Sequence, residues 1–305
     1  MSRMTGPAVL VDRLSSRVLI LDGGTGTSLQ ARGLPRGHPP DLWSVERPEE
    51  VRQVHETFLE AGADIIFTNT FGASRLHLGR YGWGDRVLEL NRVAVGLARA
   101  ASQGKALVAG DIGPCGPVAA TFGQLSRPEA TSIFAEQIEA LASSGVDLLV
   151  IETISDLQEM EVTVSAARSV SPDLPILASL TFDRDGKLRR GEGPAAAAHV
   201  LESMGVEVVS ANCSFGFASL LPICVEMAKA TSLPLAIKPS AGVPPAPPRS
   251  ADEEAEYARR FVEAGASLVG GCCGVDPAML RAIALAVKGM VPVWHSHVAP
   301  SSTNG

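Results

Sequence analysis

Short apolar runs recur along the chain, and a segment long enough for a helix follows each of them. Continuous apolar runs of this length are typical of strands that are buried on both faces, as in a parallel sheet covered by helices. Eight such runs occur, at residues 18–21, 64–68, 106–110, 147–151, 175–180, 207–211, 235–238 and 267–270. Eight strand-helix units predict an α/β fold, a single closed (β/α)8 barrel of the TIM type.

The segments between the runs carry helix signals. Pro48 and two glutamates precede an apolar stripe with helical spacing, at Val51, Val54, Phe58 and Leu59. Asp276-Pro277 and the stretch 250–253 are typical helix starts. A glycine precedes the second, fourth, sixth and eighth runs, which is a common way to end a helix. These signals support the predicted alternation of strands and helices.

Four of the connections are long, at residues 30–47, 113–127, 183–193 and 239–249. Each follows a predicted strand, so all four should lie on the carboxyl-end face of the barrel, where barrel enzymes place their active sites. The proline-rich stretch 244–248 falls between two strands and is therefore expected inside the barrel domain. We predict a barrel domain over residues 1–294 and a flexible tail over 295–305.

Composition and charge narrow the range of partners. Of the 305 residues, 46% are hydrophobic and 19% charged, which is enough for a large core. The net charge of −7 and the lack of a long basic run argue against nucleic acid and anionic membrane partners. No signal-like or membrane-spanning apolar stretch is evident, so a cytoplasmic protein is expected. A reducing compartment would leave the five cysteines free for metal or catalysis.

Three cysteines are placed where a barrel would bring them together. Cys272 and Cys273 stand between glycines after the eighth run, and Cys213 follows the sixth. Three thiolates with one open position are a known pattern for catalytic Zn²⁺. The chain has no CxxC spacing there, and an adjacent pair of cysteines is also compatible with small buried apolar residues. The surrounding residues have to decide between these readings.

Polar residues lie at or just after every predicted strand end. A structural rim would also carry some of them, but their number favours a site on one face. The set comprises Asp22, Asn69, Asp111, Glu152, Thr181, Cys213, Lys238, Cys272 and Cys273.

Several motifs, taken in order, resemble the zinc-dependent homocysteine S-methyltransferases. This family includes betaine- and S-methylmethionine-dependent enzymes and the homocysteine module of cobalamin-dependent methionine synthase. The resemblance extends from about residue 21 to 280. It rests on LDGGTGT at 21–27, GADII at 62–66, TNTFGA at 68–73, IET at 151–153, NC at 212–213 and GGCCG at 270–274.

The resemblance implies Zn²⁺ on Cys213, Cys272 and Cys273, with the homocysteine sulfur in the fourth position. Metal coordination would remove the thiol proton at neutral pH and leave a sulfur nucleophile for a methyl group, giving methionine. It also implies that Asp22 and Glu152 hold the substrate ammonium group. The further implied contacts are backbone N–H groups near Gly23 and Gly24 for the substrate carboxylate. Asn212 directly precedes a proposed ligand and is expected to hydrogen-bond the substrate or the sulfur.

The chain departs from the family pattern at two positions. Gly72 stands where some betaine-using members have a tyrosine that serves as a spare zinc ligand, and Ser240 stands where methionine synthase modules tend to have asparagine. Among other candidates, Cys115 is interpreted as an incidental loop cysteine. The remaining expectations are a core position for Cys224 and helix-surface positions for His55 and His199.

The methyl donor and the class of protein stay open at this stage. Trp43 favours a small onium donor such as S-methylmethionine or a betaine-like compound. The TNTFGA motif favours a methylcorrinoid, which a separate protein would have to bring, because no stretch of the chain resembles a cobalamin or folate module. A Schiff-base aldolase or lyase using Lys238 is one alternative function. A non-catalytic zinc-binding barrel is the other.

Overall fold

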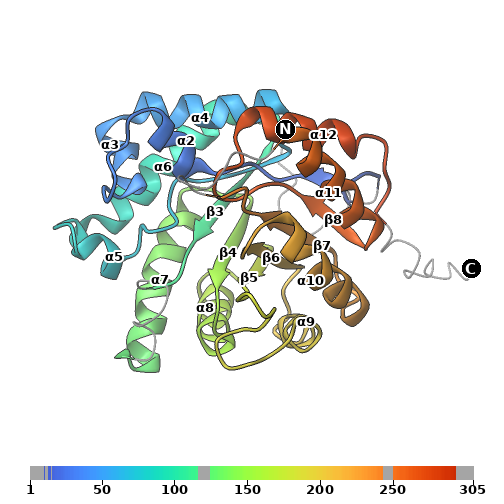
Figure 1. Cartoon of the computed structure of the whole chain (residues 1–305). Helices are drawn as coiled ribbons and strands as arrows, with labels where there is room; N and C mark the ends of the chain where they lie inside the picture. The colour runs from blue at the N-terminus through green and yellow to red at the C-terminus, as the bar shows by residue number, and fades with distance from the viewer. Residues whose placement is uncertain (1–9, 11–12, 15, 116–123, 243–249, 293–305) are drawn as a thin grey trace, which may run out of the picture.

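The computed structural model describes residues 10, 13–14, 16–115, 124–242 and 250–292. Within them, eight parallel strands form a (β/α)8 TIM barrel. Figure 1 shows strands at the centre of the molecule. The hydrogen-bonded order is β1-β8-β7-β6-β5-β4-β3-β2, and a bridge between Leu21 and Ile65 joins β1 to β2. The strands are β1 (Leu19–Ile20), β2 (Ile65–Phe67), β3 (Leu107–Ile112), β4 (Leu148–Ile154), β5 (Ile176–Leu180), β6 (Val208–Cys213), β7 (Leu235–Pro239) and β8 (Ala266–Val269).

Helices surround this sheet (Figure 1). Those in the described part of the chain are α2 (Thr25–Ala31), η1 (Pro40–Leu42), α3 (Trp43–Glu46), α4 (Pro48–Ala61), α5 (Arg75–Gly79), η2 (Gly84–Arg86), α6 (Val87–Ser102), α7 (Arg127–Ser143), α8 (Leu157–Val170), α9 (Pro194–Ser203), α10 (Phe217–Ala230), α11 (Ala251–Glu263) and α12 (Pro277–Ala286). The predicted alternation of strands and helices is confirmed. The loop at 30–47 contains two short helices, η1 and α3, that the sequence pattern did not predict.

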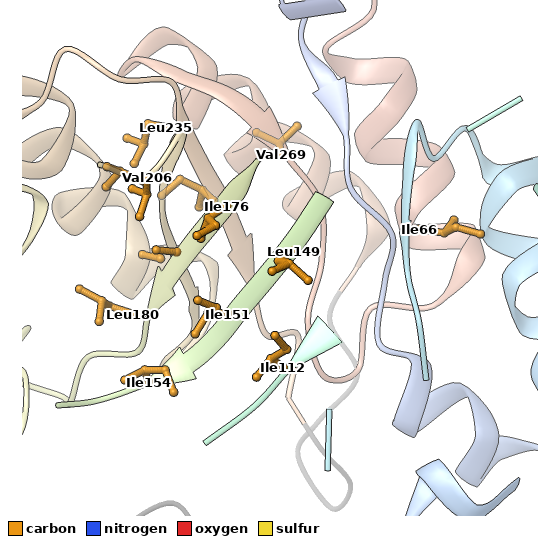
Figure 2. Close-up of a cluster of buried hydrophobic side chains, with 14 of the residues drawn as sticks. Ile66, Ile112, Leu149, Ile151, Ile154, Ile176, Leu180, Val206, Leu235 and Val269 are labelled. Atoms are coloured by element: carbon orange, nitrogen blue, oxygen red, sulfur yellow. The ribbon is translucent and has the colours of Figure 1, made fainter. Parts of the chain in front are cut away.

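Two apolar clusters fill the barrel because successive strand residues point to opposite faces. The inner cluster, with Phe67, Ala109 and Val150, closes the barrel interior. The outer cluster lies between strands and helices, and Figure 2 shows part of it, with Leu149 on β4 and Ile176 on β5. The alternation of Leu149 and Val150 between the two clusters is the pattern expected of a strand buried on both sides.

The predicted helix boundaries are confirmed. Helix α4 begins at Pro48, and α12 begins after Asp276, whose side chain accepts a hydrogen bond from the N–H of Met279. Ser250 caps α11 by accepting a hydrogen bond from the N–H of Glu253. The four glycines before alternate strands have positive φ angles, with φ values of 110°, 85°, 73° and 117° at Gly62, Gly145, Gly205 and Gly265.

His55 corrects one expectation. Its side chain is fully buried in α4 rather than on the helix surface, and no described residue bonds either ring nitrogen. Position 55 follows Val54 on the inner edge of the apolar stripe, so the ring is carried into the core with Val51 and Phe58. Burial lowers the pKa of His55 from 6.5 to about 4. His199 is exposed, as expected.

The buried imidazole predicts a pH-dependent loss of stability. The pKa of His55 is lower in the folded chain, about 4, than in the unfolded chain, about 6.5. The neutral ring's contribution to the free energy of unfolding is therefore complete above pH 6.5. Roughly 3 kcal/mol of this contribution is lost as the pH falls towards 4. Urea unfolding of wild type and His55→Leu, both with a chelator present, should show their free energies of unfolding diverging above pH 4 by this amount. Parallel pH courses would contradict the assignment.

The predicted tail at 295–305 and the proline-rich stretch at 244–248 lie outside the described residues. Within the described residues, no helix has the length and apolar character needed to cross a bilayer.

Candidate active site

A polar layer lies directly above the apolar barrel interior, at the carboxyl ends of the strands. Ala109, Val150 and Ala236 belong to the inner cluster, and the residues two positions further along the same strands are Asp111, Glu152 and Lys238. Residues i and i+2 of a strand share a face, so these three side chains project inward as well. The barrel therefore places charged groups where its apolar filling ends.

A cavity of about 430 Å³ opens above this layer. Its wall combines the layer with the end of β6 and the loops that follow β1, β2 and β8. The members used below are Gly23, Gly24, Asp41, Phe71, Gly72, His77, Tyr81, Asp111, Glu152, Cys213, Lys238, Cys272 and Cys273. The predicted location, on the face that carries the long loops, agrees with this cavity.

The three predicted cysteines meet in the cavity. The sulfurs of Cys213, at the end of β6, and of Cys272 and Cys273, just after β8, all lie within 4.8 Å of one another. Tetrahedral zinc with Zn–S bonds of about 2.3 Å would need sulfurs about 3.8 Å apart. The donor set and its spacing therefore fit a zinc ion, and a small adjustment of side-chain rotamers would close the site.

The backbone around the sulfurs is tightly fixed. Cys213 has a φ of 56° and Ser214 a φ of 48°, a left-handed conformation that non-glycine residues seldom adopt. A side chain at Gly24 would approach the carbonyl oxygen of Cys272 to 2.7 Å, and Gly274 has a φ of 81° and leaves no room for a Cβ beside Gly242. Such strain is typical of functional sites that the surrounding fold holds in place.

The crowded thiols differ in proton affinity. Hydrogen bonds from Cys213 and then Cys272 lower the pKa of Cys273 to about 3. Contacts with the other two sulfurs raise the pKa of Cys213. Thiolates and not thiols are metal ligands, so the cluster would lose protons to water when a metal binds.

Asn212 connects the sulfurs to the carboxylate of Glu152. Its Oδ1 accepts hydrogen bonds from the Ser179 hydroxyl, at 2.8 Å, and from the N–H of Thr153, at 3.0 Å. These bonds fix the orientation of the amide. Its Nδ2 donates to Thr153 Oγ1 at 2.8 Å and to Glu152 Oε2 at 3.3 Å. The same nitrogen lies 3.9 Å from the sulfur of Cys272. Asn212 thus supports two parts of the site at once.

Glu152 lies on the cavity wall, as predicted, although it is within β4 rather than after it. It is 6% exposed. Burial raises its pKa to about 8, while Lys238 opposes the shift. A cation bound beside Glu152 would favour the ionised carboxylate again, so the residue is suited to an ammonium ligand.

Asp22 follows β1, where the sequence places it, and its implied contact with the substrate stays a prediction. It is fully buried, and it is not among the described residues that line the cavity. Its Oδ2 accepts a hydrogen bond from the N–H of Phe67 at 2.7 Å, and its Oδ1 lies 3.0 Å from Lys238 Nζ. The latter contact is an ion pair without the alignment of a hydrogen bond. Lys238 therefore stands between Asp22 and the cavity.

Lys238 is held as a cation. Its ammonium group also lies 3.9 Å from the centre of the Phe67 ring. Burial alone would lower the pKa of Lys238, but Asp22, then Glu152, raise it above its ordinary value. A Schiff-base nucleophile must be a neutral amine, so this environment is unfavourable for the aldolase or lyase alternative.

The predicted substrate contacts of the first loop are partly occupied. Gly23 and Gly24 both line the cavity, but the N–H of Gly24 donates to the carbonyl of Val275 at 3.0 Å. No described backbone group accepts from the N–H of Gly23, which leaves this amide as the available donor of the pair.

The structure does not support a donor-facing role for Trp43. The residue is 7% exposed and belongs to the outer hydrophobic cluster, and it does not line the cavity among the described residues. The reason is that α3 packs against α4 and α6, which turns the indole into the core. Of the large aromatic side chains that line the cavity, Phe71 and Tyr81 are 37% and 42% exposed, whereas Phe67 is buried.

Gly72 faces a space that is already filled. A Cβ at this position would lie 2.7 Å from the ring of His77 and 2.9 Å from Asp41 Oδ2. The N–H of Gly72 donates to Asp41 Oδ1 at 2.8 Å. A tyrosine, which some family members have here, would not fit without moving both neighbours.

The other two cysteines lie outside the cluster. Cys115 is buried, and its N–H donates to Glu159 Oε1 at 3.0 Å. Burial raises its pKa to about 12, so it is an unreactive thiol. Cys224 lies in the core within α10, as predicted. Ser240, the other departure from the family pattern, bonds the carbonyl of Cys273 at 2.9 Å and supports a cluster ligand.

Comparison with known proteins identifies the family. The model of the family described as homocysteine S-methyltransferase matches residues 19–287. The chain belongs to the homocysteine S-methyltransferase family. The matched range includes all of the cluster cysteines, Glu152 and Lys238. The resemblance seen in the sequence motifs is therefore confirmed.

Individual members of the family are similar over most of this chain. Methionine synthase of Mycobacterium tuberculosis is 31% identical over 91% of the chain, and that of Mycobacterium leprae is 30% identical over 95%. The chain spans about a quarter of the length of these relatives. The metallated form of homocysteine methyltransferase MmuM from Escherichia coli has a TM-score of 0.78 and 28% identity, covering 91% of this chain and 98% of that one.

Proposed function

We propose that this protein is a zinc-dependent homocysteine S-methyltransferase that produces methionine. The observation that carries the proposal is the cluster of Cys213, Cys272 and Cys273 sulfurs in a cavity that also presents Glu152. Family membership supports methyl transfer to homocysteine, and the metallated relative supports a metal on the sulfurs. The three cysteines would hold the ion and leave a position open to the cavity.

When bound, zinc supplies a substrate sulfur that is deprotonated at neutral pH. The chain's own residues orient the rest of the substrate. Glu152 accepts hydrogen bonds from the ammonium group, and Asn212 keeps the Glu152 carboxylate in place. The N–H of Gly23 is directed to the substrate carboxylate. Holding both ends of the amino acid aligns its sulfur with the methyl group of the donor.

We infer that the donor is a small onium compound such as S-methylmethionine. Phe71 and Tyr81 offer aromatic faces at the cavity, and Asp41 adds a carboxylate on the same wall. Aromatic and acidic groups favour a cation. A methylcorrinoid carried by a separate protein is the second candidate, since the relatives named methionine synthase are about four times as long as the matched segment.

One assay tests both parts of the proposal. Zinc-loaded protein is incubated with L-homocysteine and, in turn, S-methylmethionine, betaine or a methylated corrinoid protein, and methionine is measured. We expect methionine from the onium donor, and its loss after treatment with a chelator and recovery with added zinc. Turnover only with the corrinoid protein would replace the onium donor by the second candidate. No methionine from any donor would favour the non-catalytic zinc barrel.

A further inference from the structure

Thr181 is a polar residue at a strand end that the proposed function does not use. It follows β5 directly, and it is not among the described residues that line the cavity. Its Oγ1 accepts a hydrogen bond from the N–H of Ser214 at 3.2 Å. Ser214 is the residue after Cys213, so Thr181 contacts the turn that carries one of the cluster sulfurs.

The hydroxyl of Ser214 makes two further hydrogen bonds at this turn. Its oxygen accepts from the N–H of Phe182 at 3.1 Å, and its proton is donated to the carbonyl of Asn212 at 3.1 Å. The hydroxyl oxygens of Thr181 and Ser214 lie 3.5 Å apart. These contacts, which we call the Thr181–Ser214 clasp, join the residues after β5 to the end of β6.

The clasp lies where the strand ladder has ended. The register between β5 and β6 stops at Leu180 and Ala211, two residues before Cys213. Cys213 and Ser214 then adopt φ angles of 56° and 48°, a left-handed conformation that is unfavourable for residues with a Cβ. Residues persist in this conformation only where neighbouring groups hold them. The hydrogen bonds of the clasp hold this turn.

The turn determines where the sulfur of Cys213 lies. In the structure this sulfur is within 4.8 Å of the sulfurs of Cys272 and Cys273. A change of the Cys213 φ angle to a common value would redirect its Cα–Cβ bond and move the sulfur relative to the other two. Residues that orient metal ligands in this way contribute strongly to metal affinity without touching the metal.

We propose that Thr181 and Ser214 are positioning residues for zinc, which hold the left-handed turn that directs the Cys213 thiolate to the other two sulfurs. The inference rests on the proposed function, because it takes zinc as the occupant of the cluster. Neither residue is among those that line the cavity in the described chain, so both act through Cys213.

The test measures zinc affinity rather than activity. Zinc-loaded wild type, Thr181→Val and Ser214→Ala are equilibrated with a chelating dye, whose absorbance gives the zinc Kd. Thr163→Val is the matched control, because Thr163 is buried and its hydroxyl bonds the carbonyl of Glu159 within α8. We expect both clasp variants to bind zinc at least about tenfold more weakly and the control to stay within about twofold of wild type.

Two further variants separate the backbone from the hydroxyl groups. Thr181→Ser keeps the hydroxyl and should bind zinc within about twofold of wild type. Ser214→Gly lacks the hydroxyl, but glycine adopts the left-handed conformation readily, so this variant should lose less zinc affinity than Ser214→Ala. Urea unfolding with a chelator present should show no greater loss of stability in the clasp variants than in Thr163→Val.

The proposal is overturned by wild-type zinc affinity in Thr181→Val or Ser214→Ala, or by equal weakening in Thr163→Val, which would indicate a general loss of stability. It is also overturned if Ser214→Gly loses as much affinity as Ser214→Ala. Ser214→Ala decides if Thr181→Val does not fold. Failure of wild type to bind zinc would instead reject the metal site of the proposed function, so the two failures are distinguishable.

Discussion

Replacing Cys272 or Cys273 by serine is expected to remove bound zinc and to lower methionine formation by at least about a thousandfold. The three sulfurs lie within 4.8 Å of one another, and the cluster has no fourth cysteine or histidine among the described residues to replace a lost ligand. A serine hydroxyl is a poor zinc ligand at neutral pH because it stays protonated. The measurements are metal content after dialysis and the rate of methionine formation.

The matched control is Cys224→Ala, because Cys224 is also buried but lies in α10, outside the cluster. This variant should keep its zinc. The cluster variants should lose activity more than stability, since the apolar clusters of the barrel do not depend on the metal. Stoichiometric zinc in Cys273→Ser would show that the three-cysteine cluster is not the metal site.

The apolar pattern predicted the barrel, but for several strands it placed the last residue too early in the sequence. The pattern placed the ends of β3 and β4 at residues 110 and 151, whereas the structure extends them to Ile112 and Ile154. The cause is physical. At the carboxyl ends, inward-facing positions border a cavity instead of the core, so Asp111 and Glu152 continue their strands as polar residues.

The cysteine cluster was predictable because a barrel of eight parallel strands brings the carboxyl ends of β6 and β8 to one rim. The family motifs specified the same residues. The contacts of the individual carboxylates were not predictable from the sequence. Asp22 and Glu152 stand in similar positions in the sequence, and only the closure of β1 against β8, with β7 beside it, puts Lys238 over Asp22. The motif alone implies a substrate contact for Asp22, and the structure adds its ion pair with Lys238.

The burial of helical side chains was the other property that the sequence pattern did not predict. His55 and Trp43 are residue types found both at surfaces and in cores. Their placement depends on which neighbours a helix packs against, and α3 and α4 meet through contacts that one sequence does not reveal. Each of the two errors concerned a single side chain, while the elements that carry these residues were predicted or lie within a predicted loop.

Replacing Lys238 by methionine is expected to reduce the free energy of unfolding by about 3–5 kcal/mol, which is the usual cost of removing one partner of a buried ion pair. Asp22 is fully buried and would keep only the hydrogen bond from the N–H of Phe67. Methionine matches the length of the lysine stem and can still pack on the Phe67 ring, so the loss reports mainly on the charge. Urea unfolding of zinc-free protein measures it.

The double variant Asp22→Asn/Lys238→Met tests whether the loss of stability comes from the ion pair. Neutralising both partners removes the uncompensated charge, so the double variant should be more stable than Lys238→Met alone, and the two effects should be far from additive. Asp22→Asn alone should cost less than Lys238→Met, because the Lys238 ammonium would remain close to the carboxylates of Glu152 and Asp111. Additive losses would mean that the 3.0 Å contact contributes nothing, and Asp22 would then be free to bind substrate as its motif suggested.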